Sequence, residues 1–216
     1  MIFLKGAIFD VDGTILDSMS VWYDITDRYF REHGIMLSGE AAAKIEGMTL
    51  EESLPYIQHT YLPQISAELI LEELRARVAF EYANNIPAKE GVCEYIRRLH
   101  ENGIKIAAAT SGFSELCKTA FRRIGIEEYF SAYAFSSEVG CSKSQPDIYL
   151  LAAQRLSLEP KDCCVYEDLI TGVISAGSAG FTVVAVADSS NAQDRERLIR
   201  HSDHYITGWD ELLSKI

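Results

Sequence analysis

The sequence predicts an α/β protein in which a doubly wound parallel sheet carries an inserted helical domain. Three observations support this prediction. Short apolar runs, which suit strands buried on both faces, alternate with helix-like stretches along most of the chain. Parallel neighbouring strands need right-handed helical crossovers, so repeated strand–helix–strand units give a sheet with helices on both faces. One connection is far too long for a single crossover, which indicates an insertion.

The predicted strands are short apolar runs. Five of them lie at about 4–9, 104–109, 132–136, 163–166 and 182–186, and a weaker one lies near 203–206. The predicted helices of the sheet domain lie at about 91–102, 114–124, 147–157, 170–179 and 191–200. The first of these helices places apolar residues on one face and ends before Gly103, which is a common stop signal.

The connection after the first strand is the irregular one. More than 90 residues separate that strand from the strand at 104–109, with no convincing strand between them. Amphipathic stretches occur instead at Val21–Phe30, Leu50–Tyr61 and Ala67–Tyr82. We therefore expect residues 17–85 to form a helical cap domain, and residues 1–16 and 86–216 to form the α/β core domain. A cap beside the carboxyl end of the first strand would act as a lid over the ligand site.

The composition indicates which kinds of partner the protein is expected to bind and in which compartment it is expected to occur. The 216 residues include 20 Lys and Arg against 32 Asp and Glu, a formal charge of −12, which disfavours nucleic acid or an anionic membrane as a partner. The five cysteines are scattered and include no Cys-x-x-Cys pair, so neither a disulfide framework nor a zinc site is expected. The first apolar run is too short for a signal peptide or a membrane span. We expect a cytoplasmic protein that is a monomer or a small homo-oligomer.

Two carboxylates end the first predicted strand. Asp10 and Asp12 stand two residues apart directly after the apolar run, and Gly13 allows a sharp turn. Ionised carboxylates this close repel each other, so the pair calls for a cation or a shared proton. Taken alone, the segment is equally compatible with a solvated Asp-Gly turn.

The strand at 104–109 ends in groups suited to an anion. Thr110, Ser111 and Gly112 follow it and lead into a predicted helix. Hydroxyls and free backbone N–H groups at a helix N-terminus can bind phosphate. A plain helix cap is the alternative interpretation.

A lysine occupies the loop after the strand at 132–136. Lys143 precedes a helix that begins near Pro146, where a lysine is usually a solvated surface residue. If the sheet brings this loop beside Asp10, the lysine would supply positive charge both to that carboxylate and to a phosphoryl oxygen.

The strand at 163–166 ends in two more acids, Glu167 and Asp168. In the doubly wound arrangement this strand lies next to the first one, so four carboxylates should converge: Asp10, Asp12, Glu167 and Asp168. Such an oxygen-rich site favours a hard divalent cation, and Mg²⁺ is the natural choice when a phosphate completes the coordination.

These four segments, in this order and each at a strand end, resemble the haloacid dehalogenase-like (HAD) phosphotransferase superfamily. The resemblance covers nearly the whole chain and rests on the following residues: Asp-x-Asp-Gly-Thr at Asp10–Thr14, Thr110, Lys143 with Pro146-Asp147, and Glu167-Asp168 with Gly172 and Ala176-Gly177. The helical insertion and the late segment 202–206 resemble the subgroup that contains beta-phosphoglucomutase and phosphoglycolate phosphatase.

The resemblance implies how the reaction would proceed. Asp10 would attack phosphorus to form an aspartyl-phosphate intermediate, and Asp12 would act first as general acid and then as general base. A second set of residues would bind the phosphoryl oxygens and offset their charge: Thr110, Ser111, Gly112 and Lys143.

The resemblance also implies a metal ion. Mg²⁺ would be held by the carboxylates of Asp10 and Asp168 and by the backbone carbonyl of Asp12, with Glu167 as a further candidate ligand. The metal would draw together an anionic nucleophile and an anionic phosphate, which otherwise repel each other.

The implied function is that of a Mg²⁺-dependent phosphatase acting on a small phosphorylated metabolite, such as a sugar phosphate. Dehalogenases of the superfamily do not need an acid at the position of Asp12, so its presence favours phosphoryl transfer. Leu50, in the segment Gly47–Glu52, stands where the mutase pattern has an arginine, which favours hydrolysis over a phosphosugar mutase. A non-catalytic binding module is a third alternative, which the intact motifs disfavour.

The predicted cap is rich in aromatic side chains. At helical spacing these are core residues more often than the lining of a substrate pocket, so a core role is expected for Trp22, Tyr23, Tyr29, Tyr56, His59 and Tyr61.

Overall fold

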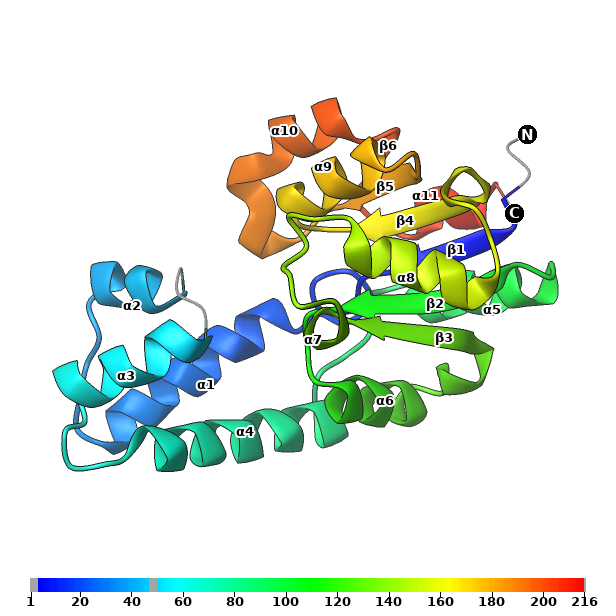
Figure 1. Cartoon of the computed structure of the whole chain (residues 1–216). Coiled ribbons are helices and arrows are strands. Elements are labelled where there is room, and N and C mark those ends of the chain that lie inside the picture. The colour runs from blue at the N-terminus through cyan, green and yellow to red at the C-terminus, as the bar shows by residue number, and fades with distance from the viewer. Residues whose placement is uncertain (1–3, 47–49, 216) are drawn as a thin grey trace. The chain divides into compact units, whose positions relative to one another are not determined.

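The computed structural model describes residues 4–46 and 50–215, and the chain divides into two compact units. One unit comprises residues 1–19 and 86–216, and the other comprises residues 20–85. All described strands belong to the first unit, which we call the α/β unit, while the second, the helical unit, is built from helices (Figure 1).

The α/β unit is built on a six-stranded parallel sheet (Figure 1). The strands are β1 (Gly6–Phe9), β2 (Lys105–Thr110), β3 (Phe130–Phe135), β4 (Cys163–Glu167), β5 (Thr182–Val186) and β6 (His204–Ile206). Their order across the sheet is β3-β2-β1-β4-β5-β6, and every neighbouring pair is parallel. This confirms the predicted doubly wound sheet, and it places β1 between β2 and β4.

The helices of this unit follow the predicted alternation. They are α5 (Val92–Glu101), α6 (Ser114–Arg123), α7 (Ser136–Val139), α8 (Asp147–Leu156), α9 (Ile170–Ser178), α10 (Arg195–His201) and α11 (Asp210–Leu213). The one-turn helices α7 and α11 were not predicted, because four residues are too few to show a helical period. The helix expected from 191 begins only at Arg195, since residues Ser189–Asp194 form a 3₁₀ helix capped by the Asp188 side chain.

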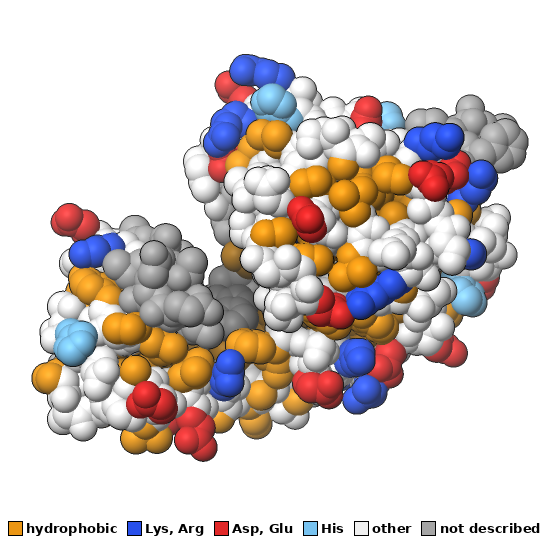
Figure 2. Space-filling model, in the orientation of Figure 1, with side chains coloured by type: hydrophobic (Ala, Val, Ile, Leu, Met, Phe, Trp, Pro, Cys, Tyr) orange, Lys and Arg blue, Asp and Glu red, His pale blue; other side chains and the backbone are white. Residues whose placement is uncertain are grey.

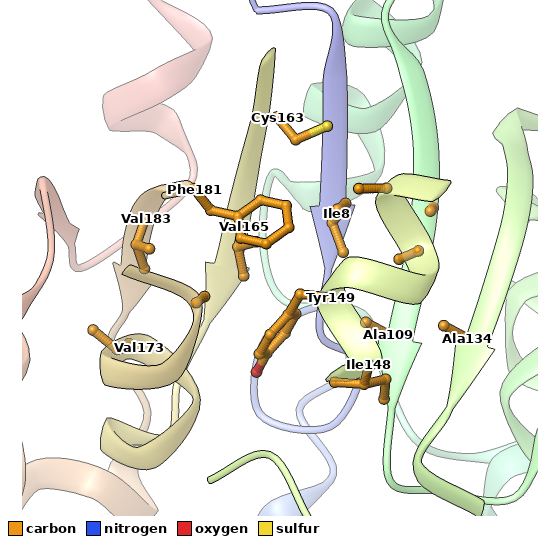
Figure 3. Close-up of a cluster of buried hydrophobic side chains, with 14 of the residues drawn as sticks. Ile8, Ala109, Ala134, Ile148, Tyr149, Cys163, Val165, Val173, Phe181 and Val183 are labelled. Atoms are coloured by element: carbon orange, nitrogen blue, oxygen red, sulfur yellow. The ribbon is translucent and has the colours of Figure 1, made fainter. Parts of the chain in front are cut away.

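One face of the sheet packs against α8, α9 and α10 (Figure 3). Every second residue of each strand points to this face, including Ile8 of β1 and Val165 of β4. Alanines such as Ala109 and Ala134 line the β2–β3 part, and their small side chains allow α8 to approach closely with Ile148. This face is one continuous apolar core.

The opposite face carries a cluster of aromatic rings. Phe9 of β1 and Tyr166 of β4 are register partners, and their rings stack with centroids 4.4 Å apart. The hydroxyls of Tyr166 and Tyr95 are hydrogen-bonded at 2.6 Å, and Trp209 packs against all three rings. Because the two strands are held in this register, Asp10, which follows Phe9, and Glu167, the last residue of β4, lie side by side at the edge of the sheet.

The helical unit has a small core of its own. It contains α1 (Met19–Glu32), from Ser20 onward, with α2 (Gly39–Glu46), α3 (Leu50–Thr60) and α4 (Ala67–Asn84), of which α2 was not predicted. The buried residues of this core are Tyr29, Phe30, Ile45, Leu54, Ile57, Leu62 and Ile70. Tyr29 is thus a core residue as expected, and its hydroxyl donates to Glu73 at 2.8 Å. Tyr56 and Tyr61 pack edge to face at the border of this core. His59 is exposed, which corrects its expected core role, and the side chains of Trp22 and Tyr23 lie outside the described part of the structure.

Residues 47–49 and the side chain of Leu50, which stands where the mutase pattern has an arginine, lie outside the described part of the structure. Among the described helices, none combines the length and apolar character that a bilayer-crossing segment requires. Figure 2 shows side chains of both charge signs spread over the visible face of the α/β unit.

Candidate active site

The end of β1 brings a buried carboxylate to the carboxyl edge of the sheet. Asp10 directly follows the strand, and its amide still donates to the carbonyl of Tyr166 at 2.9 Å, which extends the ladder to β4. The chain then turns sharply, with the amides of Ile15 and Leu16 donating to the carbonyl of Val11. Asp10 is therefore fixed by backbone contacts on both sides.

Gly13 makes this turn possible. It has a φ of +83°, which a residue with a side chain rarely adopts, and a Cβ built on it would lie 2.5 Å from Oδ2 of Asp168. The glycine thus permits both the turn after β1 and its close approach to the loop after β4.

The fold brings Lys143 beside Asp10, where it can supply positive charge to that carboxylate. Its ammonium contacts Oδ1 of Asp10 and lies 2.7 Å from Oε2 of Glu167, and all three side chains are buried. Burial alone would lower the pKa of Lys143, but the charges of Asp10 and Glu167 outweigh burial and raise it. Ser175 of α9 donates to the Lys143 carbonyl at 2.6 Å and fixes the backbone at this point.

Three carboxylates converge at this edge of the sheet. Oxygens of Asp10, Glu167 and Asp168 all lie within 4.8 Å of one another, and each residue is buried. Burial, reinforced by the charges of Asp10 and Glu167, raises the pKa of Asp168 well above its usual value. Within the described part of the chain, Lys143 is the cation paired with this cluster, and one lysine cannot balance three carboxylates, so the cluster is short of positive charge.

The Asp168 side chain is held on one oxygen only. Oδ1 accepts a long hydrogen bond of 3.4 Å from the Thr14 hydroxyl, while Oδ2 is buried and has no hydrogen-bond partner among the described residues. A buried carboxylate oxygen without a hydrogen-bond donor destabilises the folded state unless a cation binds to it. The cluster therefore fits a metal site.

The fourth predicted carboxylate does not join this cluster, which corrects the expectation that four would converge. The Asp12 side chain accepts a hydrogen bond from the Ser18 hydroxyl at 2.6 Å, and its other oxygen lies next to Gly112. The turn after β1 directs this side chain towards the loop after β2 instead of towards Asp168. The expected metal contact of Asp12 through its backbone carbonyl stays a prediction.

The hydroxyl groups of the loop after β2 already have hydrogen-bond partners within the protein. The hydroxyl of Thr110, the last residue of β2, accepts from the amide of Gly112 at 3.0 Å, and the Ser111 hydroxyl lies 2.9 Å from that of Ser136. Helix α6 begins at Ser114, as predicted, and residues 110–112 precede it. Phosphate binding by this loop stays a prediction.

Two buried residues that sequence reasoning missed hold the acidic segment after β4. The Tyr149 hydroxyl of α8 donates to Oε2 of Glu167 at 2.9 Å, and the Asn191 side-chain amide donates to the Asp168 carbonyl at 2.8 Å. Both residues lie far from their partners in sequence. In the sequence Tyr149 looks like an ordinary core aromatic, and no signal marks Asn191.

The fold and this arrangement agree with what comparisons with known proteins find. A model of the haloacid dehalogenase-like hydrolase family matches residues 4–180. The chain belongs to this family. Hexitol phosphatase A of Escherichia coli K12 is 30% identical over 207 residues, which cover 94% of this chain and 93% of that protein.

Further relatives place this HAD-like hydrolase among the phosphatases. The phosphorylated carbohydrates phosphatase of Thermotoga maritima is 28% identical over 177 residues, 82% of each chain. The crystal structure of beta-phosphoglucomutase from Clostridium difficile shares the fold, with a TM-score of 0.73, 22% identity, and coverage of 97% of this chain and 93% of that one. The enzyme is a phosphoric monoester hydrolase of the HAD-like family.

Proposed function

We propose that this HAD-like hydrolase is a Mg²⁺-dependent phosphatase that hydrolyses a small phosphorylated metabolite, of the sugar-phosphate or a similar phosphomonoester class. The observation that carries the proposal is the buried Asp10 carboxylate, which is paired with Lys143 inside an acidic cluster that is short of positive charge. The names of the relatives, a hexitol phosphatase and a phosphorylated carbohydrates phosphatase, support the substrate class.

Asp10 is the proposed nucleophile. One of its carboxylate oxygens forms a bond to phosphorus as the ester P–O bond breaks, which gives an aspartyl phosphate and the free alcohol. The leaving oxygen takes a proton from Asp12. In the second half, Asp12 removes a proton from water, whose oxygen attacks phosphorus and releases inorganic phosphate and the Asp10 carboxylate.

The residues present fit a divalent cation, with Asp10 and the unsatisfied Oδ2 of Asp168 as ligands together with the backbone carbonyl of Asp12. Bound Mg²⁺ would reduce the repulsion between the carboxylate nucleophile and the phosphate dianion. Glu167 is a weaker candidate ligand than the sequence suggests, because both of its oxygens already accept hydrogen bonds.

The proposed phosphate site surrounds the attacked phosphorus. Lys143 would offset charge on the phosphoryl oxygens during attack, in addition to its pairing with Asp10. Thr110, Ser111 and Gly112, in the loop after β2, would supply hydroxyl and amide donors to the same oxygens.

A phosphate-release screen tests the proposal. The purified protein is incubated with sugar phosphates, polyol phosphates, phosphoglycolate and nucleotides, each with Mg²⁺ or with a chelator. We expect Mg²⁺-dependent release from at least one small phosphomonoester, and none from Asp10→Asn, which preserves the shape of the side chain. Full activity of Asp10→Asn would refute the nucleophile.

A second assay separates hydrolysis from phosphoryl migration. Incubation with a hexose 1-phosphate is followed by separate measurement of free phosphate and of the hexose 6-phosphate. Conversion to the 6-phosphate without phosphate release would show a mutase and overturn the proposed hydrolysis.

A further inference from the structure

The hydroxyl of Tyr149 reaches from the apolar core into the acidic cluster. The Tyr149 ring belongs to the core between the sheet and α8, and Figure 3 shows its oxygen at the rim of that core, towards the carboxyl ends of the strands. There the hydroxyl donates to Oε2 of Glu167 at 2.9 Å. Burial raises the pKa of Tyr149 well above its usual value, so this group is a neutral donor.

Glu167 is held on both of its oxygens. Oε2 accepts from the Tyr149 hydroxyl and from the ammonium of Lys143, which lies 2.7 Å away, and Oε1 accepts from the amide of Leu169 at 3.1 Å. A rotation of the carboxylate would break at least one of these bonds inside a site where no water replaces it, because Glu167 is fully buried. Its orientation is therefore set by its neighbours.

The same neighbours fix the direction of Lys143. The ammonium contacts Asp10 on one side and Oε2 of Glu167 on the other, so its position between the two carboxylates depends on where that oxygen stands. The Tyr149 hydroxyl shares this oxygen with Lys143. The buried hydroxyl of a core tyrosine commonly donates to a nearby acceptor such as a backbone carbonyl. The Tyr149 hydroxyl instead donates to Glu167, the carboxylate that is paired with Lys143.

Space for this contact is reserved by a glycine of α9. A Cβ on Gly172 would lie 2.5 Å from the Tyr149 hydroxyl oxygen and 2.7 Å from Cδ of Glu167. The helix therefore leaves room at the point where tyrosine and glutamate meet.

We propose that Tyr149 is a positioning residue for the phosphatase reaction: it fixes Glu167, and through Glu167 it holds the Lys143 ammonium against Oδ1 of Asp10. This inference rests on the proposed function, in which Asp10 attacks phosphorus and Lys143 offsets the charge that develops. Without the hydroxyl, Glu167 can rotate, and Lys143 follows it away from the nucleophile.

The test compares two tyrosines with p-nitrophenyl phosphate as the probe and Mg²⁺ present. Tyr149→Phe keeps the ring and removes the hydroxyl, and we expect kcat and kcat/KM to fall about tenfold with KM unchanged, as for an interaction made in the transition state. The matched control is Tyr133→Phe, since the Tyr133 hydroxyl is buried without a hydrogen-bond partner in the described part of the chain. This control should keep wild-type kinetics.

A double variant shows whether Tyr149 acts through Glu167. If it does, Tyr149→Phe should cause no further fall in kcat/KM in a Glu167→Gln background, because Glu167→Gln has already disturbed the contact through which Tyr149 acts on Lys143. A full additional tenfold loss in that background would overturn the proposal, since a general loss of packing would add to the effect of Glu167→Gln.

Crystal structures of the wild type and of Tyr149→Phe give a readout that needs no turnover. We expect the Lys143 ammonium in Tyr149→Phe to lose its contact with Asp10 or with Glu167, while Tyr133→Phe keeps both. Unchanged contacts, or unchanged kcat/KM, would overturn the inference. A wild-type protein that releases no phosphate would instead refute the proposed function, and the structures would still decide the positioning role.

Discussion

At the scale of single residues, the main feature of the site is an imbalance of charge between one lysine and three buried carboxylates. Lys143 lies between Asp10 and Glu167, and Asp168 keeps one oxygen without a hydrogen-bond donor among the described residues. Removing a partner from a buried ion pair costs more than the pair contributes, because an uncompensated charge stays behind. The same shortage of positive charge fits the proposed binding of a divalent ion.

The position of Asp12 leads to a prediction about leaving groups. Its carboxylate is separate from the Asp10 cluster and is held by Ser18, which suits a group that serves the leaving oxygen instead of the metal. Asp12→Ala should reduce kcat/KM by about 10²–10⁴-fold for an alkyl phosphate, whose alkoxide needs a proton. With p-nitrophenyl phosphate, whose leaving group departs unprotonated, the loss should be much smaller. Parallel kinetics on both substrates provide the measurement, and equal losses would contradict the acid role.

The residues predicted from sequence lie at the ends of strands or in the loops that follow them. Asp10, Lys143, Glu167 and Asp168 meet because parallel strands end at one edge, a rule that needs no side-chain detail. The exclusion of Asp12 depends on the path of a tight turn, which residue types alone do not determine.

At the scale of elements, the structure shows which segments carry enough pattern to be predicted. The six strands were found because buried parallel strands are short and continuously apolar. Helix α2 was missed because its sequence, Gly39–Glu46, is short and rich in alanine, so it has little apolar period. Tyr149 and Asn191 were missed as site residues because their partners belong to another element of the fold.

Helix α9 allows a matched test of close packing. Gly172→Ala places a methyl group 2.5 Å from the Tyr149 hydroxyl oxygen, and such overpacking should lower the free energy of unfolding by about 1–3 kcal/mol. Gly177→Ala lies in the same helix with nothing nearer than 3.9 Å, and it should be neutral or stabilise by up to about 1 kcal/mol. Urea unfolding of both variants provides the measurement. Equal effects would show that the space at Gly172 is not needed.

The segment that returns to the α/β unit is joined to the end of β5 by an ion pair. Lys89 lies 2.7 Å from Asp188 and also donates to the Ala187 carbonyl, while its amide pairs with Ile15. Burial would raise the pKa of Asp188, but hydrogen bonds from Lys89 and Ser190 outweigh it and hold the pKa below its usual value.

This shift predicts how stability depends on pH. A carboxyl whose pKa is lower in the folded state binds fewer protons there than in the unfolded chain, so its contribution is present above about pH 4 and is lost as the pH falls through the folded value. The stability advantage of the wild type over Asp188→Asn should therefore be largest near neutral pH and shrink below about pH 4. Urea unfolding at several pH values provides the measurement. Asp162→Asn, in the more exposed Lys5 pair, is the control and should show little change.

At the scale of the whole molecule, the chain forms two units with separate cores. The helical unit packs its own apolar residues, and the sheet is covered on one face by α8, α9 and α10. Every side chain of the acidic cluster and its supports belongs to the α/β unit. The proposed catalytic carboxylates and the buried groups that contact them thus lie outside residues 20–85.

Cation binding should stabilise the whole protein. If Mg²⁺ binds the folded cluster, an excess of about 100 times its Kd adds about 2.7 kcal/mol to the free energy of unfolding. For a chain of this length that corresponds to a rise in Tm of roughly 5–10 °C. Calorimetry with Mg²⁺ and with a chelator provides the measurement. Asp168→Asn should abolish most of the shift, and an equal rise in that variant would place the ion elsewhere.

The stacked pair of Phe9 and Tyr166 has a consequence for protein engineering. These two rings are register partners in β1 and β4, and Asp10 and Glu167 are the next residues along the two chain segments. A slip of one residue between β1 and β4 would turn every side chain to the opposite face and separate the two carboxylates. Libraries designed for thermostability or easier expression should therefore leave this aromatic pair unrandomised, because a repacked core that still folds could yield an inactive enzyme.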